Sequence, residues 1–379
     1  MKKYFIFIAV ACAALALASC KKDNPVPAVM NPDPVVMNPD EGAIAVTIGG
    51  EASTKAVAIA VEKQLTELTF FVFDKSGGSA DGRLDIVKQA TAAEIETFNT
   101  NDYSGNWTIE KVKVGKKTVV AVANFPYARI ANIKTLNDLK LIAVNLSDNS
   151  RTATAGKFVM YGETEVTVTS GAAATPSITL NRLVARVILH EFENKLPAIY
   201  GSVTVKSVYL ANVVGNQNLG GTAVPAADKW LNKLGCKGST YTAATVIGNG
   251  DVTAEVPEIT FRASNAACAL NATAQPDASA YGFKNTSAVA PNKLSEGFNE
   301  GGAKSMFYVI VTIDGTDYWY PIELSGLEAN YDYSVKLTVI GLGNRPDDAD
   351  FGKKISKENA IVSVTVSDWA NGTPVTEII

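Results

Sequence analysis

The chain has 379 residues, of which 47% are hydrophobic and 19% are charged, and its formal net charge is −4. This length suffices for one large or two ordinary β domains. The net charge is small, and the sequence has no basic stripe of the kind expected of a nucleic-acid-binding protein. A single histidine, His190, and four cysteines leave little material for metal or acid–base chemistry.

The first twenty residues predict export. Lys2 and Lys3 precede an apolar run that is too short to span a bilayer, which is typical of a signal peptide over residues 1–19. The run ends in Leu-Ala-Ser before Cys20 and resembles the bacterial lipobox, in which the cysteine thiol is acylated after cleavage before it. A plain secretory signal with an incidental cysteine is the alternative, and it also takes the protein out of the cytoplasm.

Residues 20–41 predict a lipidated, proline-rich tether. Prolines recur through residues 25–39, and the five-residue unit at 29–33 is repeated at 36–40. Proline at this density blocks helices and central strands and favours an extended spacer. We therefore expect this segment to hold a folded body away from a lipid surface.

Short alternating apolar runs then predict strands. Ile44, Val46 and Ile48 alternate with small residues over 43–48, and a second strand is expected over 68–74. Residues 108–114 and 118–123 are predicted to form a hairpin across Gly115. A capping-like Thr135 predicts a short helix within 135–143.

The second half of the chain continues the strand pattern. The apolar stretch 177–189 is long for one strand, so we expect a domain boundary near residue 184. Strands are predicted over 203–210, 306–313, 318–322 and 333–340, with long loops and short strands over 212–300. Near the end, Val362, Val364 and Val366 alternate with serine and threonine. The pattern indicates an all-β fold of two consecutive β-sandwich (transthyretin/Ig-like) domains, residues 56–184 and 185–379, with at most one or two short helices.

No catalytic or metal-binding motif emerges from the sequence. His190 and Glu191 are neighbours on a predicted strand, where they point to opposite faces. The acidic run 347–350 lacks EF-hand spacing, and the aromatic residues of 307–320 are better explained by packing than by a glycan platform. Cys236 and Cys268 are equally compatible with a disulfide and with separate thiols. We expect a non-enzymatic protein without a cofactor or a bound metal.

Taken in order, these features resemble the FimA-type major fimbrial subunits, also called type V pilins. The matching pieces are the lipobox at Cys20, the strand at 43–48, the segment 65–74, Gly-Lys-Phe-Val-Met-Tyr-Gly at 156–162, Leu-Asn-Arg-Leu-Val-Ala-Arg-Val at 180–187 and Val-Ser-Val-Thr-Val-Ser-Asp-Trp at 362–369.

The resemblance implies a structural subunit of a cell-surface fimbrium. Such a precursor reaches the outer membrane as a lipoprotein, and a trypsin-like protease then cuts it after a basic residue. Lys55 is the only basic residue between Lys22 and Lys63, so we expect the cut between Lys55 and Ala56. Residues 42–55 are then a removable first strand, or propeptide.

The resemblance also implies assembly by donor-strand exchange. Loss of Ile44, Val46 and Ile48 leaves a groove with unpaired strand edges, which an extended segment of another subunit can fill. We expect the donor within residues 360–379, with Val362, Val364 and Val366 as the inserted side chains; whether these or the last residues insert stays open. The expected partners are neighbouring fimbrial subunits, the maturing protease and, before cleavage, the outer membrane, with no nucleic acid.

Two other functions stay open. The first is an accessory subunit of the same fimbrium, although Lys55 argues against an anchor and the C-terminal strand argues against a tip. The second is a surface glycan-binding lipoprotein, which requires exposed aromatic side chains in the second domain.

Overall fold

The computed structural model describes most of the chain after residue 39. The described residues are 40–49, 60–101, 103–151, 156–221, 230–231, 253–261, 266–269, 279–285, 304–324, 326–345, 354–368 and 374–378. The predicted lipidation at Cys20, residues 20–39 of the predicted tether, the Lys55–Ala56 junction, Cys236 and the acidic run at 347–350 lie outside them. The last residue of the predicted tether, Glu41, is the first residue of a strand.

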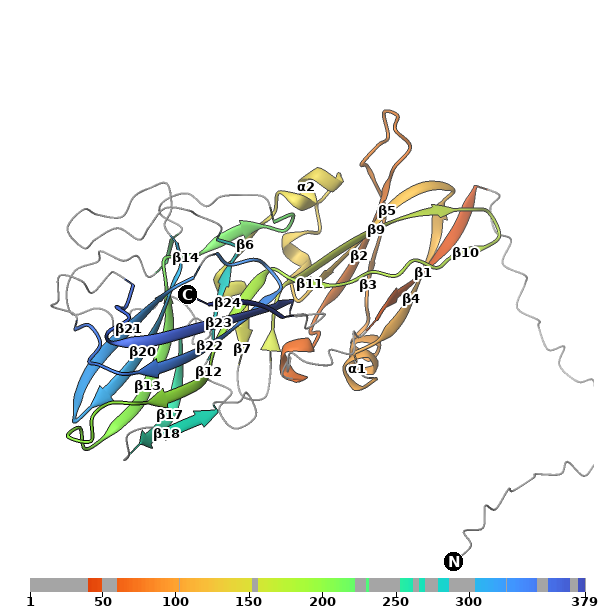
Figure 1. The fold of residues 1–379 in the computed structure, drawn as a ribbon. Helices are drawn as coiled ribbons and strands as arrows, with labels where there is room; N and C mark the ends of the chain where they lie inside the picture. Colours follow the sequence, from red (N-terminus) through yellow and green to blue (C-terminus); the bar gives the residue numbers. More distant parts are fainter. Residues whose placement is uncertain are drawn as a thin grey trace, which may run out of the picture. The chain divides into compact units, whose positions relative to one another are not determined.

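The first half of the chain forms two sheets (Figure 1). One has three strands in the order β10-β1-β4, and the other has five in the order β11-β9-β5-β2-β3. The strands are β1 Glu41–Ile48, β2 Leu68–Asp74, β3 Leu84–Gln89, β4 Gly105–Lys113, β5 Gly115–Ala123, β9 Met160–Val168, β10 Ala173–Ala174 and β11 Asn181–Arg182. Apolar side chains from both sheets meet in one buried cluster, here called the first core.

The central strands of the five-stranded sheet, β2 and β5, are buried on both faces. Phe70 and Val72 of β2 belong to the first core, whereas Phe71 and Phe73 belong to a larger second core. This division follows from the geometry of a strand, in which successive side chains point to opposite faces. The run of aromatic and branched residues in β2 therefore reflects burial on two sides.

The predicted hairpin between β4 and β5 is wrong. β4 pairs with β1 in the three-stranded sheet, whereas β5 pairs with β2 and β9 in the five-stranded sheet. Gly115, the first residue of β5, has a φ of 121°, a conformation that residues with a side chain rarely adopt. The glycine lets the chain leave one sheet and enter the other.

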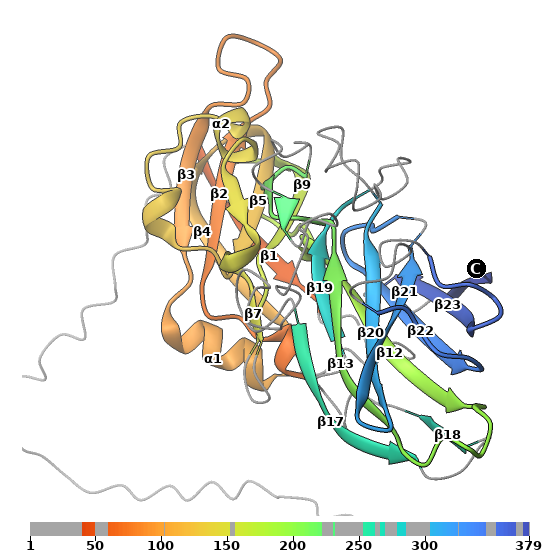
Figure 2. The same cartoon turned by 90° about the vertical axis from the view of Figure 1, so that its left-hand side faces the viewer.

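Two larger sheets form the second half (Figure 2). A six-stranded sheet has the order β18-β12-β22-β23-β24, with β19 also paired to β12, and a four-stranded sheet has the order β17-β13-β20-β21. The strands are β12 Val184–Asn194, β13 Val203–Ala211, β17 Thr253–Phe261, β18 Ala266–Ala269, β19 Ser279–Phe283, β20 Met306–Ile313, β21 Thr316–Glu323, β22 Tyr331–Val339, β23 Ala360–Asp368 and β24 Pro374–Ile378. Strands β12 and β22 run parallel, and the other pairs in these two sheets are antiparallel.

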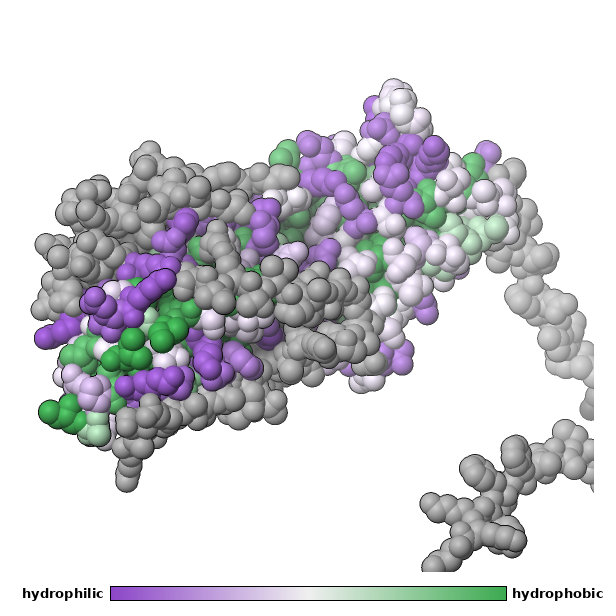
Figure 3. All heavy atoms as spheres, in the orientation of Figure 1, coloured by the Kyte–Doolittle hydropathy of each residue, from purple (hydrophilic) through white to green (hydrophobic). Residues whose placement is uncertain are grey.

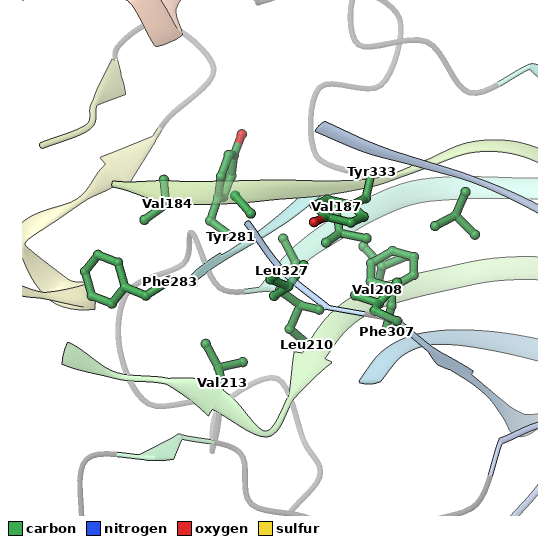
Figure 4. Close-up of a cluster of buried hydrophobic side chains, with 14 of the residues drawn as sticks. Val184, Val187, Val208, Leu210, Val213, Tyr281, Phe283, Phe307, Leu327 and Tyr333 are labelled. Carbon is green, nitrogen blue, oxygen red and sulfur yellow. The ribbon is translucent and has the colours of Figure 1, made fainter. Parts of the chain in front are cut away.

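The second core fills the space between these two sheets. Val187 and Tyr333 of the six-stranded sheet lie opposite Val208 and Phe307 of the four-stranded sheet (Figure 4). Short two-stranded pairs complete the described sheet structure. They are β14 (Val213–Val214) with β16 (Trp230–Leu231), β15 (Asn216–Asn218) with β6 (Ala143–Asn145), and β7 (Ser150–Arg151) with β8 (Gly156–Lys157).

Helices are few and short in the described part of the chain. They are α1 Ala92–Thr100, α2 Leu136–Lys140 and the 3-10 turns η1 Ala60–Lys63, η2 Tyr127–Arg129 and η3 Leu146–Asp148. The predicted helix near Thr135 is confirmed as α2, which has a capping box with Asp138; α1 was not predicted. None of the described helices is long and apolar enough to cross a membrane. The all-β fold class is confirmed, and the domain boundary near residue 184 stays a prediction.

Some hydrophobic residues reach the surface. On the face drawn in Figure 3, green residues are interleaved with purple ones over the strands of the second half. The large hydrophobic residues with the most exposure are Val114, Leu141, Ile199 and Ile361. They lie far apart in the sequence and singly, as is ordinary for a protein surface.

Candidate functional site

The first strand, β1, is inserted between two other segments. It runs antiparallel to β4, from Glu41 opposite Lys113 to Ile48 opposite Gly105, and parallel to β10. Beyond β10 the second ladder continues, because Thr47 N–H donates to the carbonyl of Pro176 at 2.9 Å. Ile178 N–H donates back to the carbonyl of Thr47, also at 2.9 Å. Removal of β1 would leave both flanking backbones unpaired.

The inward side chains of β1 form part of the first core. Ile44 and Val46 are 0% exposed and Ile48 is 2% exposed, whereas Thr47 between them is exposed. They belong to the same cluster as Phe70. Burial of a side chain of this size contributes roughly 1.5–3 kcal/mol, so this short strand contributes several kilocalories per mole to the first core.

A second set of buried contacts holds the chain in place soon after β1. Glu62, in η1, is buried, and its carboxylate accepts a hydrogen bond from Nη1 of Arg186 at 3.0 Å and one from the Tyr281 hydroxyl at 2.7 Å. Its carbonyl oxygen accepts from Nε and Nη2 of Arg182 at 3.2 and 2.9 Å. Arg186 also binds Asp332 through Nε and Nη2, at 3.0 and 2.7 Å. We call these five residues the Glu62 cluster.

Opposite charges balance within the Glu62 cluster, since two guanidinium groups face two carboxylates. Burial lowers the pKa of Arg182 to about 10, despite the opposing effect of Glu62. Burial disfavours charge on Arg186 as well, but the carboxylates of Glu62 and Asp332 outweigh it and raise the pKa of Arg186. Arg186 is therefore charged, and paired on two sides, at any physiological pH.

The predicted donor residues lie in β23, inside the six-stranded sheet. Val362 and Val364 are buried in the second core, and Val366 is half-buried beside it. On one side β23 pairs with β22, from Ala360 opposite Val339 to Asp368 opposite Tyr331. On its other side β23 pairs with β24, which ends the strand order of this sheet.

The two strands singled out by the sequence share one burial pattern. In β1, Gly42, Ile44, Val46 and Ile48 are buried and the residues between them are exposed or half-buried. In β23, Ala360, Val362 and Val364 are buried and Val366 is half-buried, again with more exposed residues between them. Both strands carry the dipeptide Val-Thr, at 46–47 and at 364–365.

The histidine and the aromatic residues considered for chemistry or glycan binding take ordinary structural positions. His190 is exposed on β12, at a bulge between Leu189 and Glu191. Among the aromatic residues, Tyr308 and Tyr320 are fully buried and Trp319 is 9% exposed, so these three pack as predicted, whereas Tyr318 is half-buried. Within the described residues, no group of three or more His, Cys, Asp or Glu side chains is arranged to hold a metal ion.

The Glu62 cluster was missed as a site, although its arginines lie in the segment 180–187. Arg182 and Arg186 interrupt an otherwise apolar run, and a charge in such a run signals a buried pair. Their partners at residues 62, 281 and 332 are too distant in the sequence to be read from it.

Residues 44–182 match the family model of the major fimbrial subunit protein FimA. The match begins at Ile44 within β1 and ends at Arg182, so it includes β4 and β10, which flank that strand. It confirms the resemblance to the FimA-type fimbrial subunits. No curated protein matches the chain in sequence.

Solved structures share the fold over nearly the whole chain. A fimbrilin from Porphyromonas gingivalis has a TM-score of 0.54 at 14% identity, covering 88% of this chain and 99% of that chain. A candidate cell adhesion protein from Bacteroides eggerthii has a TM-score of 0.56 at 17% identity, covering 87% and 96%. A second one, from Parabacteroides distasonis, has a TM-score of 0.53 at 18% identity, covering 87% and 99%. At these identities the likeness shows a common fold.

Proposed function

We propose that this chain is a structural subunit of a cell-surface fimbrium, exported as a lipoprotein, cut after Lys55 and polymerised by strand exchange. The observation that carries the proposal is the placement of β1, whose inward side chains belong to the first core. The strand ends at Ile48, a few residues before Lys55, which is the only basic residue between Lys22 and Lys63. The match of residues 44–182 to the major fimbrial subunit family supports the fimbrial role. The role is mechanical, and catalysis has no part in it.

Cleavage after Lys55 separates β1 from the rest of the chain. Without β1, the edges of β4 and β10 lose their hydrogen-bond partners and the sites of Ile44, Val46 and Ile48 empty. Refilling the groove recovers roughly 1.5–3 kcal/mol for each apolar side chain and about 0.5–1.5 kcal/mol for each ladder hydrogen bond. An extended segment of another subunit therefore has a large driving force to enter.

We propose residues 360–379 of a neighbouring copy as that segment. The shared pattern of β1 and β23 supports Val362 in the site of Ile44, Val364 in that of Val46 and Val366 in that of Ile48. Because β24 is paired with β23 alone in the described part of the sheet, both strands leave together when the β22–β23 ladder opens. Exit of β24 alone, which opens a shorter ladder, is the alternative route.

A difference in fit explains why cleavage has to come first. Two of the three proposed insertions replace isoleucine with the smaller valine, and Ala360 brings a β-carbon to the crowded position of Gly42, so residues 168–169 have to shift. The subunit's own strand thus fills the groove better than a neighbour's strand does, and it is covalently attached. Once it is removed, donor and groove, which belong to different sheets of each copy, can make a head-to-tail contact that does not close, which generates a filament.

The test uses a peptide of β1 as a competitor. Purified chain cut after Lys55 should form filaments visible by electron microscopy, and an excess of the peptide 41–48 should suppress them by filling the groove. The same peptide with Val46→Asp is the matched control and should leave filaments unaffected. Cut chain that stays monomeric without any peptide would contradict the proposal.

A further inference from the structure

The Glu62 cluster lies next to a second basic residue that a trypsin-like protease would recognise. Lys63 directly follows Glu62 and ends η1. The Lys63 ammonium lies 5.6 Å from the centre of the Tyr103 ring, and its side chain is half-buried. A cut here would fall eight residues beyond the proposed one.

The backbone around Lys63 is held in a shape that resists cleavage. Residues 60–63 form a 3-10 turn, and the carbonyl of Glu62 is engaged by two donors of Arg182. The Glu62 side chain is bound inside the protein by Arg186 and Tyr281. Proteases cut accessible segments that open locally, so these contacts must break before Lys63 can be cleaved.

Cleavage after Lys63 would separate Glu62 from the rest of the chain and so break the Glu62 cluster. The product would begin at Gln64 and lose every contact of Glu62 with Arg182, Arg186 and Tyr281. Those contacts join the turn that follows β1 to β11, β12 and β19. Leu65, which is buried in the first core, would then lie one residue from a charged terminus.

We propose that the Glu62 cluster selects the maturation site, by holding Lys63 in a protected turn so that the protease cuts only upstream of Ala60. The inference rests on the proposed function, because it concerns the same maturation step. It makes Glu62 a positioning residue for cleavage. The cluster sets the N-terminus of the mature subunit and keeps it attached to the second half of the chain.

Limited trypsin digestion of the purified full-length chain tests this proposal, with N-terminal sequencing and intact mass as readouts. The unaltered chain should give a product that begins at Ala56. Glu62→Ala should add a product that begins at Gln64, with cleavage after Lys63 faster by about tenfold or more. Glu96→Ala, on the exposed face of α1, is the matched control and should leave the product unchanged.

Two further variants decide the remaining outcomes. Lys63→Gln added to Glu62→Ala should abolish the second product, which identifies the new cut. If the Glu62→Ala variant unfolds and is cut at many sites, the Glu62→Gln variant tests the proposal instead. This variant should stay folded, because Arg186 still binds Asp332 and the amide oxygen of the new side chain still accepts a hydrogen bond from Tyr281. A Gln64 product from Glu62→Gln supports the proposal.

Unchanged products from Glu62→Ala, or from Glu62→Gln where that variant decides, would overturn it. An unaltered chain that is never cut after Lys55 would instead contradict the proposed function.

Discussion

A β-carbon on Gly42 would lie 2.5 Å from the carbonyl oxygen of Thr169 and 2.7 Å from Cγ1 of Val168. Real β-carbons essentially never approach so closely, so a residue with a side chain fits at position 42 only if β1 or residues 168–169 shift. Gly49, just after the same strand, has nothing within 4 Å of its β-carbon position. The two glycines therefore make a matched pair for asking how β1 is seated.

Gly42→Ala should destabilise the precursor and leave the matured chain unaffected. The added methyl group forces β1 or its neighbours to shift, at a cost of about 1–3 kcal/mol. After cleavage, residue 42 departs with the propeptide and the cost disappears. Thermal unfolding before and after cleavage measures the difference, with Gly49→Ala as the control. Equal midpoints for Gly42→Ala and the unaltered precursor would show that β1 is not tightly seated.

Val366→Asp should prevent filament formation without unfolding the subunit. Val366 is half-buried in its own sheet, so a carboxylate there stays partly hydrated, whereas the proposed site of Ile48 is closed to water. Burying an unpaired carboxylate costs several kilocalories per mole. Electron microscopy of the cut chain reads the outcome, and circular dichroism checks the fold. Thr365→Asp, one residue away on the opposite face, is the control; loss of filaments in both variants, or in neither, would contradict the assignment of β23.

Val362→Ile together with Val366→Ile should strengthen the filament. Each substitution restores a methylene that the isoleucines of β1 bury in the groove, worth about 0.8 kcal/mol per site. The denaturant concentration at which filaments dissociate should rise. Val364→Ile is the control, since its proposed site holds Val46 in the precursor and has no room to spare. A rise for Val364→Ile alone would indicate a different register.

Glu163 should contribute stability that is lost in acid. Burial alone would raise its pKa, but hydrogen bonds from Lys140 and Tyr161 and the charges of Lys140 and Lys75 lower this pKa below its ordinary value. A carboxyl with a depressed folded-state pKa stabilises the fold above its unfolded pKa, and this stability is lost as the pH falls through the folded pKa. Glu163→Gln should therefore be less stable than the unaltered chain at pH 7, and the two should converge as the pH falls below the lowered pKa of Glu163. Thermal midpoints across that range measure the effect; a constant difference would contradict it.

Alternation in the sequence predicted the strands whose one face is buried. Ile44 to Ile48 and Val362 to Val366 appear as β1 and β23 because every second residue packs into a core. Thr135 predicted α2 because it is a capping residue. Thr91 and Glu94 form the same capping box at α1, with the glutamate that is usual at the third helical position, yet α1 was not predicted.

Relations between distant segments were not predictable in this way. The turn at Gly115 suits a hairpin locally, yet β4 and β5 join different sheets because each finds partners far away in the chain. The same holds for Glu62 and Arg186, whose pairing spans 124 residues. Local patterns report which side chains are buried, whereas tertiary packing decides what they meet.

The most direct test of the account is the N-terminal sequence of the protein in sheared surface material and, separately, in outer-membrane fractions. We expect the sheared material to begin at Ala56, which means that β1 has been removed from the assembled subunits. The membrane fraction should still contain the precursor that begins at a lipidated Cys20. A lipidated Cys20 in both fractions, with no shorter form, would mean that the groove never opens and would contradict assembly by strand exchange.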